Sequence, residues 1–125
     1  MGDLARLIEA GPFYICDLRP EWSKQWAVTF WRPANAGYAY PLSWSGKYDR
    51  ETVMERGAYY HQREGGKLTR FPVPCSVADA LATEPPRGMI EDDAGPIVRN
   101  TKEHRAKLRA AGRAILRALE AEGRG

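Results

Sequence analysis

Two neighbouring stretches in the first half of the chain alternate between large apolar residues and small or polar ones. Residues 26–31 (WAVTFW) and residues 38–44 (YAYPLSW) share this period of two, which is typical of strands. Residues 33–37 (PANAG) between them favour a turn. The pattern predicts a hairpin over residues 26–44 and leaves open which of its faces is buried. Because Pro41 has no backbone N–H, we expect the second strand at a sheet edge or with a bulge.

Three more segments have the length and apolar content of strands. Residues 13–18 (FYICDL) form a short apolar run, and residues 58–64 and 67–73 flank the Gly65-Gly66 pair, which is typical of a hairpin turn. Combined with the helices described next, these segments predict an α+β fold. We expect a small, mostly antiparallel sheet of three to five strands.

Three short helices are expected where a capping residue precedes a helical pattern. These helices and their caps are residues 4–10 after Asp3, residues 50–56 after Asp49, and residues 77–82 after Ser76. Gly11-Pro12 ends the first helix. In the third, Asp79 stands three residues after Ser76, as in a capping box.

The longest helix is expected at the C-terminus, over residues 101–121. Leu108, Ile115 and Leu119 fall on one side of it and form an apolar stripe. Gly112 interrupts this helix at a cost of about 1 kcal/mol relative to Ala. Four arginines are expected on the other side, as a solvated face or a partner-binding surface: Arg105, Arg109, Arg113 and Arg117.

Residues 83–100 contain three prolines, two glycines and the acidic run 91–93, which predicts a long loop. The whole chain of 125 residues is expected to form one domain, 1–125. Its net charge of +3 is uneven: eight Lys/Arg and three Asp/Glu from residue 99 onward give that end a net of +5. This asymmetry hints at an anionic partner.

The remaining bulk properties indicate a protein of a reducing compartment. There are two cysteines, Cys16 and Cys75, where a disulfide scaffold would carry more. No run of 18 apolar residues exists, so we expect no membrane span. Charges interrupt the N-terminal residues, which argues against a signal peptide. We therefore expect a cytoplasmic protein.

Aromatic residues are concentrated in one part of the chain, since twelve of the thirteen lie between Phe13 and Tyr60. One interpretation is an aromatic core. The other is a platform on which a flat ligand stacks while neighbouring cations contact its anionic group. The ligand-binding candidates under the second interpretation are Arg19, Trp31, Arg32, Tyr38, Tyr40, Trp44, Lys47 and Tyr48.

No arrangement of residues indicates catalysis or a metal site. Cys16, Cys75, His61 and His104 lack the close spacing of zinc ligands, and no nucleophile motif or phosphate-binding glycine loop is present. Neighbouring acids such as those at 91–93 can hold Mg²⁺ but are more often simply solvated. We therefore predict no catalytic residue, no metal and no cofactor, and a protein that is not an enzyme.

Four short motifs resemble small uncharacterised proteins encoded by phages and prophages. They are Tyr14-Ile15, Trp31-Arg32-Pro33, Gly37-Tyr38 and Gly46-Lys47-Tyr48, within residues 13–60. The resemblance implies an accessory protein in the cytoplasm of a bacterial host. Proteins of that kind often counter host defence, either by binding a defence protein or by sequestering a nucleotide signal.

The favoured hypothesis is a counter-defence protein that captures a nucleotide-like anionic ligand on its aromatic and basic surface. The alternative is an anti-CRISPR-type inhibitor. It would bind a host defence protein through the arginines of the C-terminal helix and the loop 83–100, and block the nucleic-acid site of that protein. Direct binding of nucleic acid has weaker support, and an oligomer is left open.

Overall fold

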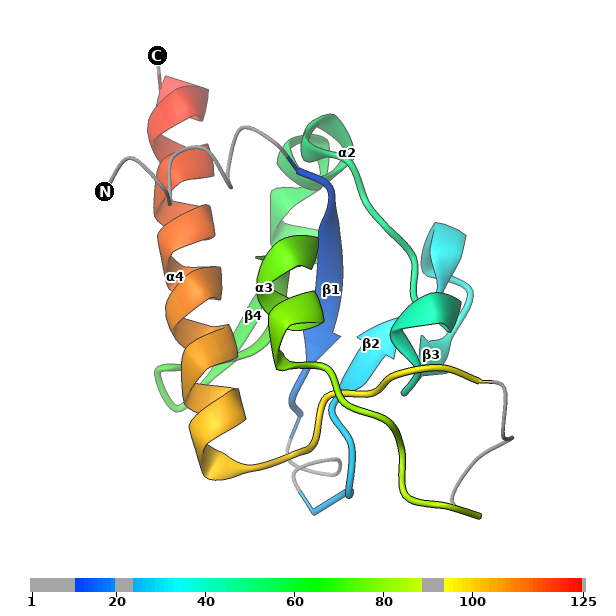
Figure 1. Ribbon diagram of the computed structural model, residues 1–125. Coiled ribbons are helices and arrows are strands. Elements are labelled where there is room, and N and C mark those ends of the chain that lie inside the picture. The colour runs from blue at the N-terminus through cyan, green and yellow to red at the C-terminus, as the bar shows by residue number, and fades with distance from the viewer. Residues whose placement is uncertain (1–10, 20–23, 89–93, 125) are drawn as a thin grey trace.

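The computed structural model describes residues 11–19, 24–88 and 94–124. Five strands form one antiparallel sheet in the order β3-β2-β1-β5-β4 (Figure 1). The strands are β1 (Phe13–Asp17), β2 (Thr29–Trp31), β3 (Tyr38–Ala39), β4 (Gln62–Glu64) and β5 (Lys67–Pro74). The helices are α2 (Arg50–Glu55), α3 (Cys75–Leu81) and α4 (Lys102–Arg124). The expected α+β fold with a long C-terminal helix is confirmed.

The central strand, β1, is buried along its whole length. It pairs with β2 on one side, where Cys16 faces Phe30, and with β5 on the other, where Cys16 faces Phe71. Side chains of paired residues lie on the same face of a sheet, and neighbours along a strand lie on opposite faces. The register therefore assigns each side chain of these three strands to one of two layers.

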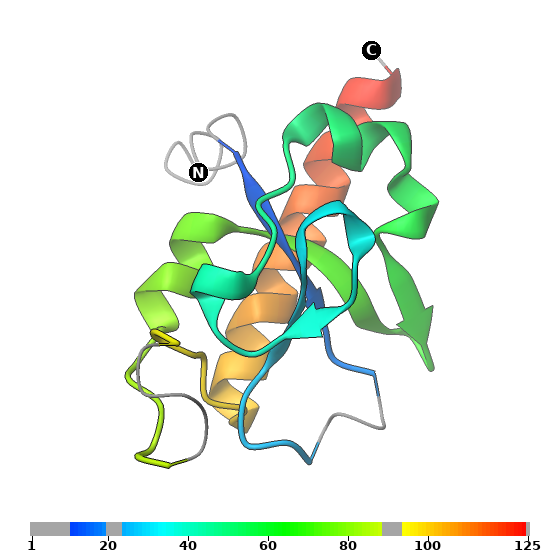
Figure 2. The ribbon, with the colours of Figure 1, turned by 90° about the vertical axis from the view of Figure 1, so that its right-hand side faces the viewer.

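Helices α3 and α4 pack on the layer that contains Cys16, Phe30 and Phe71. Figure 2 shows α4 running behind the sheet when the hairpin β2–β3 faces the viewer. The apolar stripe of α4 is buried as expected. Leu108 belongs to the cluster under α3 and α4, while Ile115 and Leu119 belong to a second one.

The second cluster is rich in aromatic rings and joins the other layer of the sheet to α2 and the last turns of α4. Its members are Phe13, Ile15, Trp31, Tyr48, Val53, Tyr60, Ile115 and Leu119. The rings of Trp31 and Tyr60 stand edge to face at 5.9 Å, and those of Tyr48 and Tyr60 lie 5.4 Å apart. Many of the aromatic residues between Phe13 and Tyr60 are thus core residues.

Two local predictions are confirmed in detail. The carboxylate of Asp49 accepts a hydrogen bond from the backbone N–H of Thr52 at 2.8 Å, so it caps α2 as the sequence predicts. Gly65 and Gly66 connect β4 to β5 with φ of 57° and 82°. Both angles lie in the left-handed region that this type of hairpin turn requires.

Three strands are shorter than expected. Of the predicted strand 58–64, only Gln62–Glu64 is a strand, β4. The segment 38–44 is a strand only over Tyr38–Ala39, and a 3₁₀ helix follows at Leu42–Trp44. β3 is an edge strand, as Pro41 predicts. The segment 26–31 is a strand only over Thr29–Trp31.

The expected cap of α3 is wrong. The helix starts at Cys75, and no side chain caps it. The carboxylate of Asp79 instead accepts a hydrogen bond from the Tyr14 hydroxyl at 2.7 Å. A contact with a distant strand has replaced the local capping box.

The described parts of residues 83–100 are irregular, as expected, but they contribute to the core. Ile97 and Val98 are fully buried, and the Val98 carbonyl accepts a hydrogen bond from Val28 N–H at 2.8 Å. The predicted helix 4–10 and the acidic run 91–93 lie outside the described residues. None of the helices described is long and apolar enough to cross a membrane.

Candidate functional site

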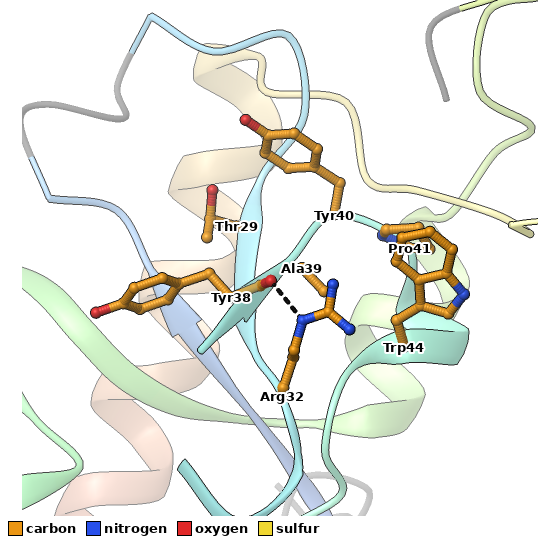
Figure 3. Close-up of a pocket in the computed structure, with 7 residues that line it drawn as sticks. All are labelled: Thr29, Arg32, Tyr38, Ala39, Tyr40, Pro41 and Trp44. Carbon is orange, nitrogen blue, oxygen red and sulfur yellow. Dashed lines mark hydrogen bonds between the residues drawn. The ribbon is translucent and has the colours of Figure 1, made fainter. Parts of the chain in front are cut away.

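The predicted hairpin surrounds a cavity of about 350 Å³ on the edge of the sheet (Figure 3). Its lining comes from β2, β3 and the segment that follows, and comprises Thr29, Arg32, Tyr38, Ala39, Tyr40, Pro41 and Trp44. Four of these were expected to bind a ligand: Arg32, Tyr38, Tyr40 and Trp44. None of the described residues that line the cavity is acidic.

Arg32 reaches across the cavity and is held at two points. Its Nε donates a hydrogen bond to the Tyr38 carbonyl at 2.9 Å, and its guanidinium carbon lies 5.4 Å from the centre of the Trp44 ring (Figure 3). The Arg32 N–H also bonds to the Gly37 carbonyl at 2.7 Å, which closes the turn. The terminal nitrogens of Arg32 donate no hydrogen bond to any of the described residues.

Tyr40 forms the opposite wall. Its ring packs against Trp26 with 5.5 Å between the ring centres, and its hydroxyl donates a hydrogen bond to Gln25 Oε1 at 3.0 Å. Tyr40 and Trp44 are both partly exposed. The cavity thus has aromatic side walls and a guanidinium between them, a combination of apolar surface and placed polar groups that is common in ligand sites.

The turn that carries Arg32 is strained and held from below. Ala34 and Asn35 have φ of 57° and 59°, a region that costs a residue such as Ala34 roughly 1–2 kcal/mol and that asparagine tolerates better. Two buried tyrosines oppose this strain. The Tyr48 hydroxyl donates to the Arg32 carbonyl and accepts from Asn35 N–H, while the Tyr60 hydroxyl donates to Asn35 Oδ1 at 3.0 Å.

The structure does not bring all eight expected residues together. Trp31 and Tyr48 are only 5% and 6% exposed, so they support the site from within the core. Lys47 lies on a separate, polar cavity of about 440 Å³ beside α2. Arg19 is outside the first cavity but donates a hydrogen bond from a terminal nitrogen to the Tyr38 hydroxyl at 2.7 Å.

Beside the cavity, three of the expected residues, Arg19, Trp31 and Tyr38, form a cluster with three that were not expected, Asp17, Tyr59 and Arg70. Asp17 is fully buried, and its carboxylate accepts hydrogen bonds from Trp31 Nε1 at 3.1 Å and from Arg19 Nε at 3.0 Å. The guanidinium carbon of Arg70 lies 5.2 Å from the Trp31 ring centre and 5.7 Å from that of Tyr59. We call Arg19, Trp31, Tyr38, Tyr59 and Arg70 the aromatic–arginine patch.

The sequence contains only a faint signal for this patch. Arg70 is a charge in the middle of the predicted strand 67–73, but its position depends on the pairing of β1 with β5, which sets Asp17 opposite Arg70 across 53 residues of chain. Tyr59 lies in the predicted strand 58–64, yet it belongs to a 3₁₀ helix, Gly57–Tyr59.

The four arginines of α4 do not form one free surface. Arg109 is half-buried and its Nε donates to the Leu68 carbonyl at 2.9 Å; burial lowers its pKa. Arg105 donates to Asn100 Oδ1 at 2.7 Å. Only Arg113 and Arg117 are exposed. Arg109 is therefore not part of a solvated stripe, and Arg105 is only partly exposed.

The thiols and imidazoles are placed for structural roles. Burial raises the pKa of Cys16, and burial together with the nearby Asp79 raises that of Cys75 to about 11, so both are poor nucleophiles at neutral pH. The Nδ1 atoms of His61 and His104 lie within 2.8 Å of backbone carbonyls. Within the described ranges, no three His, Cys, Asp or Glu residues could hold a metal ion.

Comparison with known proteins offers no further guidance on the site. No family model matches the chain, and no curated protein or solved structure is significantly similar to it.

Proposed function

We propose that the protein binds a small ligand with a flat ring and an anionic group, such as a nucleotide, in the cavity of the hairpin. One observation carries this proposal. Arg32 is positioned between aromatic walls by Tyr38 and Trp44, yet its terminal nitrogens are left without acceptors among the described residues. An arginine fixed at Nε with open terminal nitrogens suits a phosphate or carboxylate.

The aromatic walls supply the second half of recognition. A ring between Tyr40 and Trp44 would stack on an exposed aromatic face, which is worth about 1–3 kcal/mol per base. The cavity volume of about 350 Å³ is at the lower end of the range for small-molecule sites, so it suits one ring system rather than a large cofactor. The proposed activity is binding and not catalysis.

Isothermal titration of the full chain with adenosine 5′-monophosphate, guanosine 5′-monophosphate and inorganic phosphate tests this function. At least one nucleotide should bind, and Arg32→Ala should weaken it at least tenfold. The variant Arg32→Lys retains the charge but not the planar group, and should recover only part of the affinity. Arg87→Ala, a change at an exposed arginine outside the cavity, serves as the matched control.

The outcomes separate clearly, provided that thermal unfolding shows each variant to be folded. If Arg32→Ala and the unchanged protein bind the nucleotide with equal affinity, the cavity is not the binding site. Binding by none of the three ligands would overturn the proposed class of ligand. The counter-defence role is the biological setting that the phage resemblance implies, and it stays a prediction.

A further inference from the structure

The aromatic–arginine patch exposes two tyrosines around one buried tryptophan. Tyr38 is 45% exposed and Tyr59 is 47% exposed, while Trp31 beneath them is almost covered. Both tyrosine rings meet Trp31 edge to face, with ring centres 6.3 Å and 5.5 Å away. Each also has a guanidinium over it, from Arg19 at 5.5 Å and from Arg70 at 5.7 Å. The patch therefore repeats one unit, an exposed ring with an arginine.

Arg70 is the residue of the patch that has an unsatisfied hydrogen-bond donor. Its Nε is buried, and no group in the described part of the chain accepts a hydrogen bond from it. Asp17 stands opposite Arg70 in the β1–β5 pair, but both of its oxygens are already bound, by Arg19 and Trp31. A buried donor without an acceptor costs roughly 1–3 kcal/mol. Because this atom has no accessible surface, an anionic group of a ligand would satisfy it only after the Arg70 side chain shifts toward the surface.

The direction of Arg70 places this donor on the ligand side of the sheet. Its neighbour Phe71 packs toward α4, where a Cβ at Gly112 would lie 2.4 Å from the phenyl ring. Successive side chains of a strand point to opposite faces. The guanidinium of Arg70 therefore lies on the side away from α4, where it covers Trp31.

We propose that the patch is a second subsite, which binds the phosphate and base that follow the nucleotide in the cavity, so that the ligand is a single-stranded oligonucleotide. This inference rests on the proposed function, because the first nucleotide occupies the cavity. Tyr38 connects the two sites: it lines the cavity and also packs on Trp31. The phosphate meets Arg70, and the next base stacks on Tyr59.

Single-stranded nucleic acid is the occupant that this surface suits best. Such strands are bound by exposed aromatic rings that stack on successive bases and by cations that track the phosphates. The patch contains two arginines, one of which, Arg19, is ion-paired with the buried carboxylate of Asp17. The net charge of these three groups is positive, which is complementary to a polyanion.

Titrations with adenosine 5′-monophosphate and with a single-stranded oligoadenylate of about eight nucleotides test the second subsite. The oligonucleotide should bind at least tenfold more tightly than the mononucleotide. Arg70→Ala and Tyr59→Ala should each remove most of this advantage while the affinity for the mononucleotide stays within twofold. Tyr59→Phe retains the ring and should preserve the advantage. Arg70→Ala should also reduce the slope of log affinity against log salt by about 0.7, the value for one lost phosphate contact.

Arg113→Ala is the matched control, because Arg113 is exposed on α4, behind the sheet (Figure 2). It should leave the advantage of the oligonucleotide intact. An equal loss in Arg113→Ala and Arg70→Ala would overturn the subsite in favour of general charge attraction. Thermal unfolding shows whether each variant is folded. If Arg70→Ala does not fold, the comparison of Tyr59→Ala with Tyr59→Phe tests the second subsite instead.

The two proposals fail in different ways. If oligoadenylate and the mononucleotide bind with equal affinity, the second subsite is wrong and the cavity stands. If neither binds, both proposals are wrong. If Arg70→Ala weakens both ligands equally, Arg70 acts on the cavity or the fold and not on a second phosphate, and the subsite is again overturned.

Discussion

Replacement of Gly112 by alanine sets helix propensity against packing within α4. Gly112 is buried in the middle of the helix. An ideal Cβ there lies 2.4 Å from Phe71 Cδ2, 3.0 Å from Cγ and 3.1 Å from Cε2. Carbon atoms in contact are normally 3.5–4.0 Å apart. The phenyl ring or the helix would have to move by roughly 1 Å to admit one methyl group.

The net effect on stability follows from two opposing contributions. Alanine is favoured over glycine in a helix interior by about 1 kcal/mol. Overpacking of a well-packed core costs typically 1–3 kcal/mol, and the upper part of that range applies because Phe71 is fully buried among neighbours on every side. We expect Gly112→Ala to lower the free energy of unfolding by about 1–2 kcal/mol.

Urea denaturation followed by circular dichroism measures this change, and a partner substitution isolates its cause. In a Phe71→Leu background the ring is absent, so Gly112→Ala should there be neutral or stabilising by up to about 1 kcal/mol. The exposed Ala110→Gly reports propensity alone and should cost about 1 kcal/mol. An increase in stability on Gly112→Ala with Phe71 present would refute the packing argument.

Two further predictions concern the strained turn and the buried thiols. Ala34→Gly should raise the free energy of unfolding by about 0.5–1 kcal/mol, because glycine adopts the φ of 57° without strain. The control Ala36→Gly, at φ −88°, should lower the free energy of unfolding. Urea denaturation compares the two variants, and equal effects would contradict the proposed strain at Ala34. The raised pKa of Cys75, about 11, means that the folded state disfavours the thiolate form. The protonated thiol therefore contributes fully to the stability of the fold below the unfolded pKa of about 8.5, and this contribution is lost as the pH rises toward 11. Cys75→Ala should weaken this alkaline decline in stability, and iodoacetamide should label Cys75 at pH 8 only after unfolding; rapid labelling of the folded protein would show that the thiol is not protected.

Local signals predicted those elements whose cause is local. Asp49 caps α2 through a bond to an N–H three residues away, and the Gly65-Gly66 turn joins strands that are adjacent in the chain. The register of a two-residue hairpin follows from its turn. Both could therefore be predicted from a few neighbouring residues.

Signals that compete with distant contacts were misleading. The alternation of residues 38–44 continues beyond the real strand, because Pro41 ends the ladder and the Leu42 N–H instead bonds to the Pro96 carbonyl at 3.0 Å. Asp79 could cap its own helix but bonds to Tyr14 of β1. In both cases the hydrogen-bond partner lies more than 50 residues away in the chain, so a local sequence pattern cannot predict the contact.

The candidate site was predictable in its centre and not at its margin. Arg32, Tyr38, Tyr40 and Trp44 lie in one hairpin and its extension, so a single correct turn was enough to bring them together. Arg70 reaches the patch only through the pairing of β5 with β1. Its proposed role is inferred from three-dimensional observations, a buried Nε and a tryptophan beneath the guanidinium.

In this protein, a core role of the aromatic segment does not exclude the proposed role as a platform. Buried rings hold the backbone that presents the exposed ones: the hydroxyls of Tyr48 and Tyr60 hold the strained turn after Arg32, and Trp31 supports Tyr38 and Tyr59 at the surface. A turn with two left-handed residues would relax if only local forces acted on it. Because core tyrosines oppose that relaxation, the backbone at Arg32 is already held in place, which would reduce the entropy that the proposed binding must overcome.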